Sequence, residues 1–468
     1  MFTALNQAVS AVNDVLWSYV LIIMLVGCGL WFTFKMKFTQ LTMLPEMIRL
    51  MGEGVGTKTE GNQISSFQAF CVSTASRVGV GNIAGIAIAV VSGGPGAVFW
   101  MWVISIIGSA TGFVESTLAQ IYKLPRENGG FHGGPAYYIK NALGSSWASM
   151  LFAVLISVTY GLIFNSVQAN TIALSLETAF GLDRTMVGAA VAVLSGLVIF
   201  GGVSRIARLS EWLVPIMAGI YILTALLITL VNIDKLPGLL VLIVSNAFTP
   251  DAVFGGGFAA AIMTGIKRGL FSNEAGMGSV PNAAATAIAS HPVKQGLIQA
   301  FGVFVDTLLV CTSSAFLVLV IGDYTSTGLT GIALVQYNLG QYLGSWAPSA
   351  LAILVFMFAF SSIVGNYYYG EINIPFIHGS KTTLHIFRIC VAAMVFFGSI
   401  AELSLVWNLA DLFMALMAIT NLIAITFLAK YAYIALADYK KQKAQGIEEP
   451  VFKASVMPNT KGIYFWKD

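Results

Sequence analysis

Long apolar runs separated by short polar stretches are the feature that most constrains the fold of this chain. Hydrophobic residues make up 57% of its 468 residues and charged residues only 10%, whereas soluble proteins carry about 25% charged residues. A helix of about 20 apolar residues crosses the bilayer core. A chain of this length is therefore described by its number of membrane spans rather than by a number of soluble domains. We expect an all-α polytopic membrane protein.

Eleven runs are long enough to be expected as spans. The first covers residues 16–34, and ten more are expected at 65–92, 97–121, 146–180, 186–202, 213–231, 252–279, 296–321, 348–371, 386–400 and 405–435. Residues 38–51 mix apolar and charged side chains, which suits an interfacial connector. The chain therefore divides into an N-terminal part (1–64), two sets of five helices (65–231 and 232–435) and a tail (436–468).

The basic residues predict the orientation, because lysine and arginine accumulate in cytoplasmic loops. Along the eleven-span path, every lysine and arginine except Arg184, Lys235 and the intramembrane Arg77 falls on one side. Lys267 and Arg268 are among them and are assigned to the loop side after the sixth of the ten spans. We expect the amino terminus outside and the carboxyl terminus in the cytoplasm.

Two of the expected spans contain breaks at equivalent places. Arg77 is followed by Gly79, Gly81 and Gly85, which predicts an interruption near residues 78–81. The sixth of the ten spans carries glycines at 255–257 and the run 263–266 further in. Glycines also occur simply as packing residues. Five spans separate the two runs, so the halves are inverted, and discontinuous helices of inverted halves form substrate sites near the midplane.

Other function classes find little support in the sequence. The net charge of +3 is small and dispersed, so nucleic acid is not an expected partner. Repeated filter loops or charged rings typical of channels are not apparent. The cysteines stand far apart in apolar runs, and the histidines lack acidic or thiol partners at catalytic spacing, so neither a zinc site nor an enzyme is expected. These residues are Cys28, Cys71, Cys311, Cys390, His132, His291, His378 and His385.

Three stretches together resemble the alanine or glycine:cation symporter family over most of the chain. The first is VGVGNIAG at 78–85, followed by GGPGAVFWMW at 93–102. The second is GGPAYYI at 133–139. The third is KRGLFSNEAGMGS at 267–279, with HPV at 291–293 and Asp306-Thr307 downstream. The resemblance implies a five-plus-five inverted-repeat transporter with discontinuous first and sixth core helices, alternating access and sodium coupling.

The resemblance also implies a sodium site between the first broken helix and the eighth core helix. Its ligands would be the carbonyls of Ala75, Val78 and Phe358 and the hydroxyls of Ser361 and Ser362. Oxygen ligands suit a hard cation. The alternative for the two serines is a hydrogen bond within their own helix.

The amino-acid site is expected at the same breaks. Unpaired amides at Val80 and Gly81 would suit a carboxylate, the ammonium would face carbonyls of the sixth span, and the resemblance marks Gln168 as the side chain that reaches the substrate. Asn82 is expected to support the unwound turn, and Asn366 stands where many relatives have tryptophan. The full candidate set is Thr74, Gly79, Val80, Gly81, Asn82, Gln168, Met263, Thr264, Gly265, Ile266 and Asn366.

The expected function is sodium-coupled import of alanine or glycine across a prokaryotic inner membrane, with sodium as coupling ion and no cofactor. Proton coupling in the same fold is the alternative, and Asp306 or Glu115 would then carry the proton. Either acid is instead a candidate ion-pair partner for Arg77. The choice among alanine, glycine, serine and a D-amino acid stays open, as does the oligomeric state.

Overall fold

The computed structural model describes residues 2–54, 63–126, 129–201, 203–249, 257–321 and 324–466. Helices dominate this part of the chain, and one short hairpin pairs Leu124 with His132 and Pro125 with Phe131. The elements of the first half are α1 (Phe2–Val15), η1 (Leu16–Leu21), α2 (Ile22–Lys35), α3 (Thr39–Thr42), α4 (Leu44–Gly54), α5 (Ser66–Arg77), η2 (Gly81–Gly85), α6 (Ile86–Gly93), α7 (Gly96–Ile121), β1 (Leu124–Pro125), β2 (Phe131–His132), α8 (Pro135–Tyr138), η3 (Ile139–Leu143), α9 (Ser146–Val158), η4 (Thr159–Phe164), α10 (Asn165–Phe180), α11 (Arg184–Ile199) and α12 (Val203–Val231).

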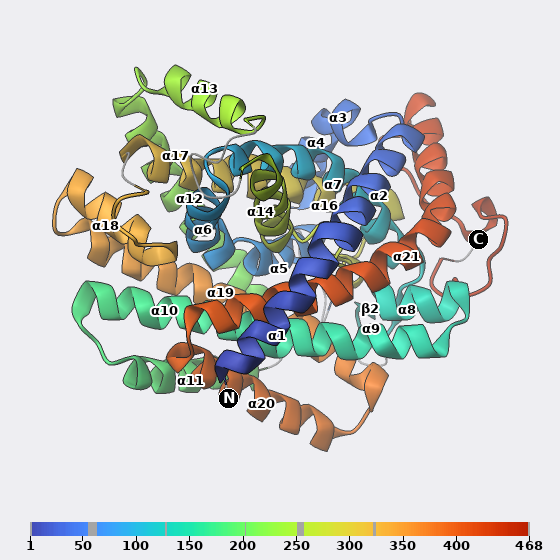
Figure 1. Ribbon diagram of the computed structural model, residues 1–468. Helices are drawn as coiled ribbons and strands as arrows, with labels where there is room; N and C mark the ends of the chain where they lie inside the picture. Colours follow the sequence, from blue (N-terminus) through green and yellow to red (C-terminus); the bar gives the residue numbers. More distant parts are fainter. Residues whose placement is uncertain are drawn as a thin grey trace.

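The second half continues in the same way. Its elements are α13 (Leu236–Asn246), α14 (Gly257–Asn273), α15 (Val280–Thr286), α16 (Pro292–Phe304), η5 (Val305–Cys311), α17 (Thr312–Ile321), α18 (Gly331–Leu343), α19 (Ala347–Ile377), α20 (Lys381–Ile400), α21 (Leu403–Ala444) and η6 (Ala454–Val456). Figure 1 shows α5, α6 and α14 near the middle of the molecule, and α1 and α2 running as one diagonal across the front of α21.

Eight helices of the described residues are long and apolar enough to cross a membrane, and a bent pair makes nine. The sequence predicts eleven spans, and two of them form helices that are too short to be counted among these nine. The first, expected over 186–202, is the 16-residue helix α11. The second, expected over 252–279, is the 17-residue helix α14, which ends where the chain turns at Glu274. The protein is an all-helical polytopic membrane protein with eight or nine candidate spans.

The bent pair is the break predicted in the first of the ten spans. A capping box between Ser65 and Gln68 starts α5. After Arg77 the chain leaves helical geometry at Val78 (φ −81°, ψ 86°), and the helix resumes at Gly81 after a 50° bend. The glycines around this point have no side chains to hold the helix, which explains why the run opens here.

The second break lies later in the chain than the sequence suggested, and Gly255 and Gly256 of the predicted glycine run lie outside the described residues. Residues 263–266 are part of the continuous helix α14, so the predicted opening there is wrong. A Cβ on Gly265 would lie 2.4 Å from the carbonyl oxygen of Ala97, so this glycine serves close packing on α7. The chain opens instead at Glu274, Gly276 and Gly278, which have φ angles of 58°, 92° and 80°.

The two broken helices run in opposite directions beside each other. Ile64, just before α5, forms a parallel bridge with Ala287, just after α15. At the other end, a Cβ on Gly93 would lie 3.1 Å from the carbonyl oxygen of Ala260 near the start of α14. The start of one broken helix therefore meets the end of the other.

Candidate functional site

The break after α5 leaves backbone amides without partners in the helix, and two side chains accept hydrogen bonds from them. The amide of Gly79 donates to Oδ1 of Asn82 at 3.0 Å. The amide of Val80 donates to Oε1 of Gln168 at 3.2 Å. Gln168 lies on α10 and is 2% exposed. The oxygen of Gln168 thus lies where the substrate carboxylate is expected from the sequence.

Asn82 also joins the first break to the elements behind it. Its Nδ2 donates to Oδ1 of Asp306 at 2.7 Å and to Oγ of Ser272 at 2.8 Å. Ser272 donates to the other carboxylate oxygen of Asp306 at 2.6 Å, and the sulfur of Cys311 lies 3.2 Å from the Asn82 nitrogen. Asp306 is therefore held by hydrogen bonds from η2 and α14.

Glu274 occupies the second break and connects both broken helices. Its carboxylate accepts hydrogen bonds from Ser76, in the last turn of α5, and from Ser279, which precedes α15, each at 2.7 Å. The residue is buried and has a positive φ, which is uncommon outside glycine. Ser76 also lies 2.7 Å from Oδ1 of Asn366. Glu274 belongs to the run 267–279, but the sequence alone predicts no role for it; the NEAGMGS run with its two glycines is the available signal.

The acids proposed as partners of Arg77 are engaged elsewhere. Arg77 is 2% exposed, and its Nη1 donates to the carbonyl of Gln299 at 3.3 Å. A Cβ on Gly302 would lie 2.1 Å from that nitrogen, so this glycine makes room for the guanidinium. Glu115 accepts the amides of Gly276 and Gly278, both at 3.1 Å. Among the described residues no ion pair joins Arg77 to Glu115 or Asp306.

Part of the predicted sodium set comes together. Oγ of Ser362 donates to the carbonyl of Ala75 at 2.9 Å, and a Cβ on Gly79 would lie 2.3 Å from the same hydroxyl. Ser361 donates to the carbonyl of Phe358 at 2.8 Å within α19. Ser361 therefore makes the intrahelical bond named as its alternative. Val78 is fully buried at the start of the break.

Aromatic rings cover the glycine face of η2. A Cβ on Gly81 would lie 2.7 Å from the ring of Phe271, and one on Gly85 would lie 3.4 Å from Trp407. Phe271 and Trp407 contact each other, with ring centroids 4.8 Å apart. The guanidinium of Arg268 lies 4.6 Å from the Trp407 ring. These side chains close the site on the side of α14 and α21.

An ion pair secures this aromatic cover. Nη2 of Arg268 lies 2.5 Å from both carboxylate oxygens of Asp411, and Nζ of Lys267 lies 3.6 Å from one of them. Trp17 of η1 donates to the carbonyl of Asp411 at 3.3 Å. The prediction that Lys267 and Arg268 belong to a loop is wrong, because both lie inside α14 and Arg268 is 5% exposed.

Known proteins resemble this chain over nearly its whole length. The model of the sodium:alanine symporter family matches residues 2–454. A Bacillus subtilis (strain 168) protein described as a probable sodium/glutamine symporter is 54% identical, covering 99% of this chain and 96% of that protein. An amino-acid carrier protein of the same organism is 51% identical, covering 99% and 98%.

More distant proteins extend the comparison. A sodium/alanine symporter from Methanococcus maripaludis is 37% identical, covering 90% of this chain and 94% of that protein. A manganese transporter mutant from Eremococcus coleocola, solved by crystallography, gives a TM-score of 0.48 at 14% identity, covering 85% of each chain. The chain is a transporter, not an enzyme, and it belongs to the sodium:alanine symporter family.

Proposed function

We propose that this protein imports a small neutral amino acid, alanine or glycine, together with sodium, by alternating access at the two broken helices. The observation that carries the proposal is the amide of Val80, which is freed by the break and bonded only to the oxygen of Gln168 among the described residues. A backbone amide at the start of a half-helix favours an anion. The substrate carboxylate would replace the Gln168 oxygen there.

The substrate ammonium would face the end of α14 rather than residues 263–266. The last carbonyls of a helix lack partners within the helix, and its dipole favours a cation there. α14 ends at Asn273, beside the buried carboxylate of Glu274. Phe271 would lie over the substrate, since its ring already approaches Gly81. A site so covered favours a small side chain.

Sodium would bind where Ser362 meets the carbonyl of Ala75. The hydroxyl and the carbonyl are 2.9 Å apart, and both belong to elements that meet at the first break. Val78, Phe358 and Ser361 complete the proposed ligand set if Ser361 turns away from its intrahelical bond. Coupling follows because the ion would stabilise the same unwound backbone that binds the substrate.

Glutamine is the second candidate substrate, and Asn366 favours it. Asn366 is 1% exposed, and its Nδ2 has no hydrogen-bond partner among the described residues. A buried unpaired amide is costly, and the side-chain oxygen of glutamine would satisfy it. The relative with 54% identity is described as a sodium/glutamine symporter. Thr74, whose buried hydroxyl also has no partner in the described part of the chain, lies two residues before Ser76, the serine that contacts Asn366.

The test is uptake of labelled alanine, glycine and glutamine into liposomes that contain the purified protein. A sodium gradient and a proton gradient are applied separately. Uptake of alanine or glycine with sodium alone supports the proposal, and glutamine uptake supports the second candidate. Uptake with protons alone refutes sodium coupling and directs attention to Asp306 and Glu115.

The sodium site has its own test in Ser362→Ala. The variant should need more sodium for half-maximal uptake, while substrate affinity at saturating sodium changes less. Unaltered sodium dependence would rule Ser362 out as a ligand. We further propose a cytoplasmic C-terminus and an external N-terminus in a prokaryotic inner membrane. Labelling of cysteines placed in each terminus of intact cells tests this orientation.

A further inference from the structure

The segment after the last helix folds back over the face where α5 begins and α15 ends, here called the tail face. Gln442 of α21 exchanges two hydrogen bonds with the backbone of Val451, both at 2.9 Å. The amide of Phe452 then donates to the carbonyl of Ser290 at 3.0 Å. Figure 1 shows the C-terminus beside α8 and β2. The segment is thus packed on the helix bundle.

Its last residues enclose a buried lysine. Nζ of Lys123 lies 4.1 Å from the ring of Phe131, 4.6 Å from that of Phe465 and 4.9 Å from that of Trp466. Two of these three rings belong to the tail. Lys123 is fully buried, and this burial lowers the pKa of its amine, whereas the aromatic faces around the amine favour its charged form. The tail therefore shields Lys123 from water.

Lys123 in turn holds the end of the sixth core helix. Its Nζ donates to the carbonyl of Ala287 at 3.0 Å and to Oε1 of Gln120 at 2.8 Å. Gln120 donates to the same carbonyl at 3.0 Å, and Trp466 donates to the carbonyl of Gln120 at 2.9 Å. Ala287 directly follows α15, so the tail acts on the half-helix that leaves the second break.

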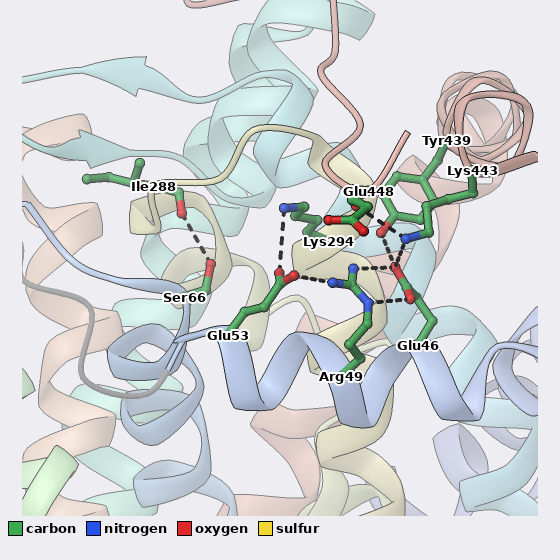
Figure 2. Close-up of polar contacts among 9 residues, drawn as sticks. All are labelled: Glu46, Arg49, Glu53, Ser66, Ile288, Lys294, Tyr439, Lys443 and Glu448. Atoms are coloured by element: carbon green, nitrogen blue, oxygen red, sulfur yellow. Dashed lines mark hydrogen bonds and ion pairs between the residues drawn. The ribbon is translucent and has the colours of Figure 1, made fainter. Parts of the chain in front are cut away.

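The residue after Ala287 also forms hydrogen bonds with the start of the first broken helix. The amide of Ile288 donates to the carbonyl of Ile64 at 3.0 Å, and Ser66 donates to the carbonyl of Ile288 at 3.1 Å. Figure 2 shows this contact beside the ion pair of Lys294 with Glu53, which joins α16 to α4 at 3.7 Å. Both half-helices on the tail face are therefore fixed at one place.

We propose that residues 452–466 are a latch that keeps the tail face closed, with Lys123 as the positioning residue through which they act on α15. Alternating access requires the half-helices on this face to separate from their neighbours. Separation pulls the carbonyl of Ala287 from Lys123 and disturbs the aromatic cage. The family model ends at residue 454, so most of the latch lies beyond the part of the chain that it matches.

Hydrogen exchange of the purified protein tests the latch without any assumption about the substrate. The variant combines Phe465→Ala with Trp466→Ala, and Tyr464→Ala is the matched control because Tyr464 is 60% exposed. Amides of residues 280–290 should exchange about tenfold faster in the double variant, because loss of a desolvated cation–π contact and a hydrogen bond loosens local structure. Exchange in α20 should stay the same, and the control should match the wild type.

A second readout separates a latch from a purely structural role. Weakening the latch lowers the population that faces outward, so the KM for external substrate in whole cells should rise by the factor by which that population falls. A structural defect lowers the maximal rate and leaves KM unchanged. The KM measurement rests on the proposed function, whereas the hydrogen-exchange measurement does not. Each can therefore fail separately.

Two further variants keep the proposal open to refutation if the double variant loses its fold. Trp466→Phe keeps a ring but removes the N–H that reaches Gln120, and Lys123→Met keeps the apolar stem but removes the charge. Each should accelerate exchange at residues 280–290 by less than the double variant. Wild-type exchange at these residues in the folded variants would overturn the proposal.

Discussion

Gly79→Ala is the substitution that tests the sodium site most directly. The added Cβ would lie 2.3 Å from Oγ of Ser362, whereas real Cβ contacts below 3.0 Å essentially never occur. The hydroxyl must retreat by at least 0.7 Å, the difference between these distances. The retreat changes its 2.9 Å bond to the carbonyl of Ala75, and these two oxygens are the centre of the proposed sodium site.

The size of the effect follows from overpacking. Forcing one extra carbon into a packed place costs about 1–3 kcal/mol, which corresponds to about 5-fold to 150-fold in an equilibrium constant. The sodium concentration for half-maximal uptake should rise within this range. Because Gly79 does not have a left-handed φ, alanine adds the contact without backbone strain.

Sodium-dependent uptake in liposomes is the assay, with thermal unfolding measured in parallel. Gly219→Ala is the matched control, since a Cβ at this position of α12 meets nothing within 4 Å. Gly81→Ala is the contrasting variant, because its Cβ would lie 2.7 Å from Phe271 and should raise the substrate KM instead. If Gly79→Ala leaves sodium dependence unchanged while the protein stays folded, the assignment of sodium to this place is refuted.

Three other predictions address separate parts of the molecule. Gln168→Ala should change substrate preference while the sodium response is retained; an unchanged competition profile among amino acids would contradict the role of Gln168. Asp411→Asn should lower the free energy of unfolding by about 3–5 kcal/mol, because it leaves buried Arg268 without its partner, and denaturant or thermal melts that match the wild type would exclude this. Hydrogen bonds from Arg49 lower the pKa of Glu46 to about 2 in the folded protein, below the value of about 4.3 for an unfolded chain. The Glu46 carboxylate therefore stabilises the fold above the pKa of the unfolded chain, and this stabilisation is lost as the pH falls towards the pKa of the folded protein. The melting-temperature difference between wild type and Glu46→Gln, present at pH 7, should therefore vanish near pH 2, and a difference independent of pH would disprove the linkage.

Span prediction succeeded where a single apolar run forms a single helix. The runs expected over 97–121 and 146–180 became the continuous candidate spans Gly96–Ile121 and Ser146–Phe180. It failed for α14: the run expected as a span over 252–279 forms a helix that ends at Asn273, and Lys267 and Arg268, which the sequence assigns to the loop side, lie inside this helix. Burial against Asp411, Trp407 and Trp17 supplies the compensation that permits them inside the bundle, and those partners are far away in the sequence.

The sequence alone determined that the chain is a membrane protein, that the first core helix breaks near residues 78–81, and which family it resembles. These features depend on local composition: apolar runs exclude water, and clustered glycines weaken a helix wherever they occur. Only the tertiary structure decided where the second broken helix, formed by α14 and α15, opens. Glycine at 265 and glycine at 276 look alike in sequence, but one packs against the backbone of α7 and the other turns the chain with a positive φ. Which role a glycine takes depends on neighbours brought close by folding, and local sequence does not contain them.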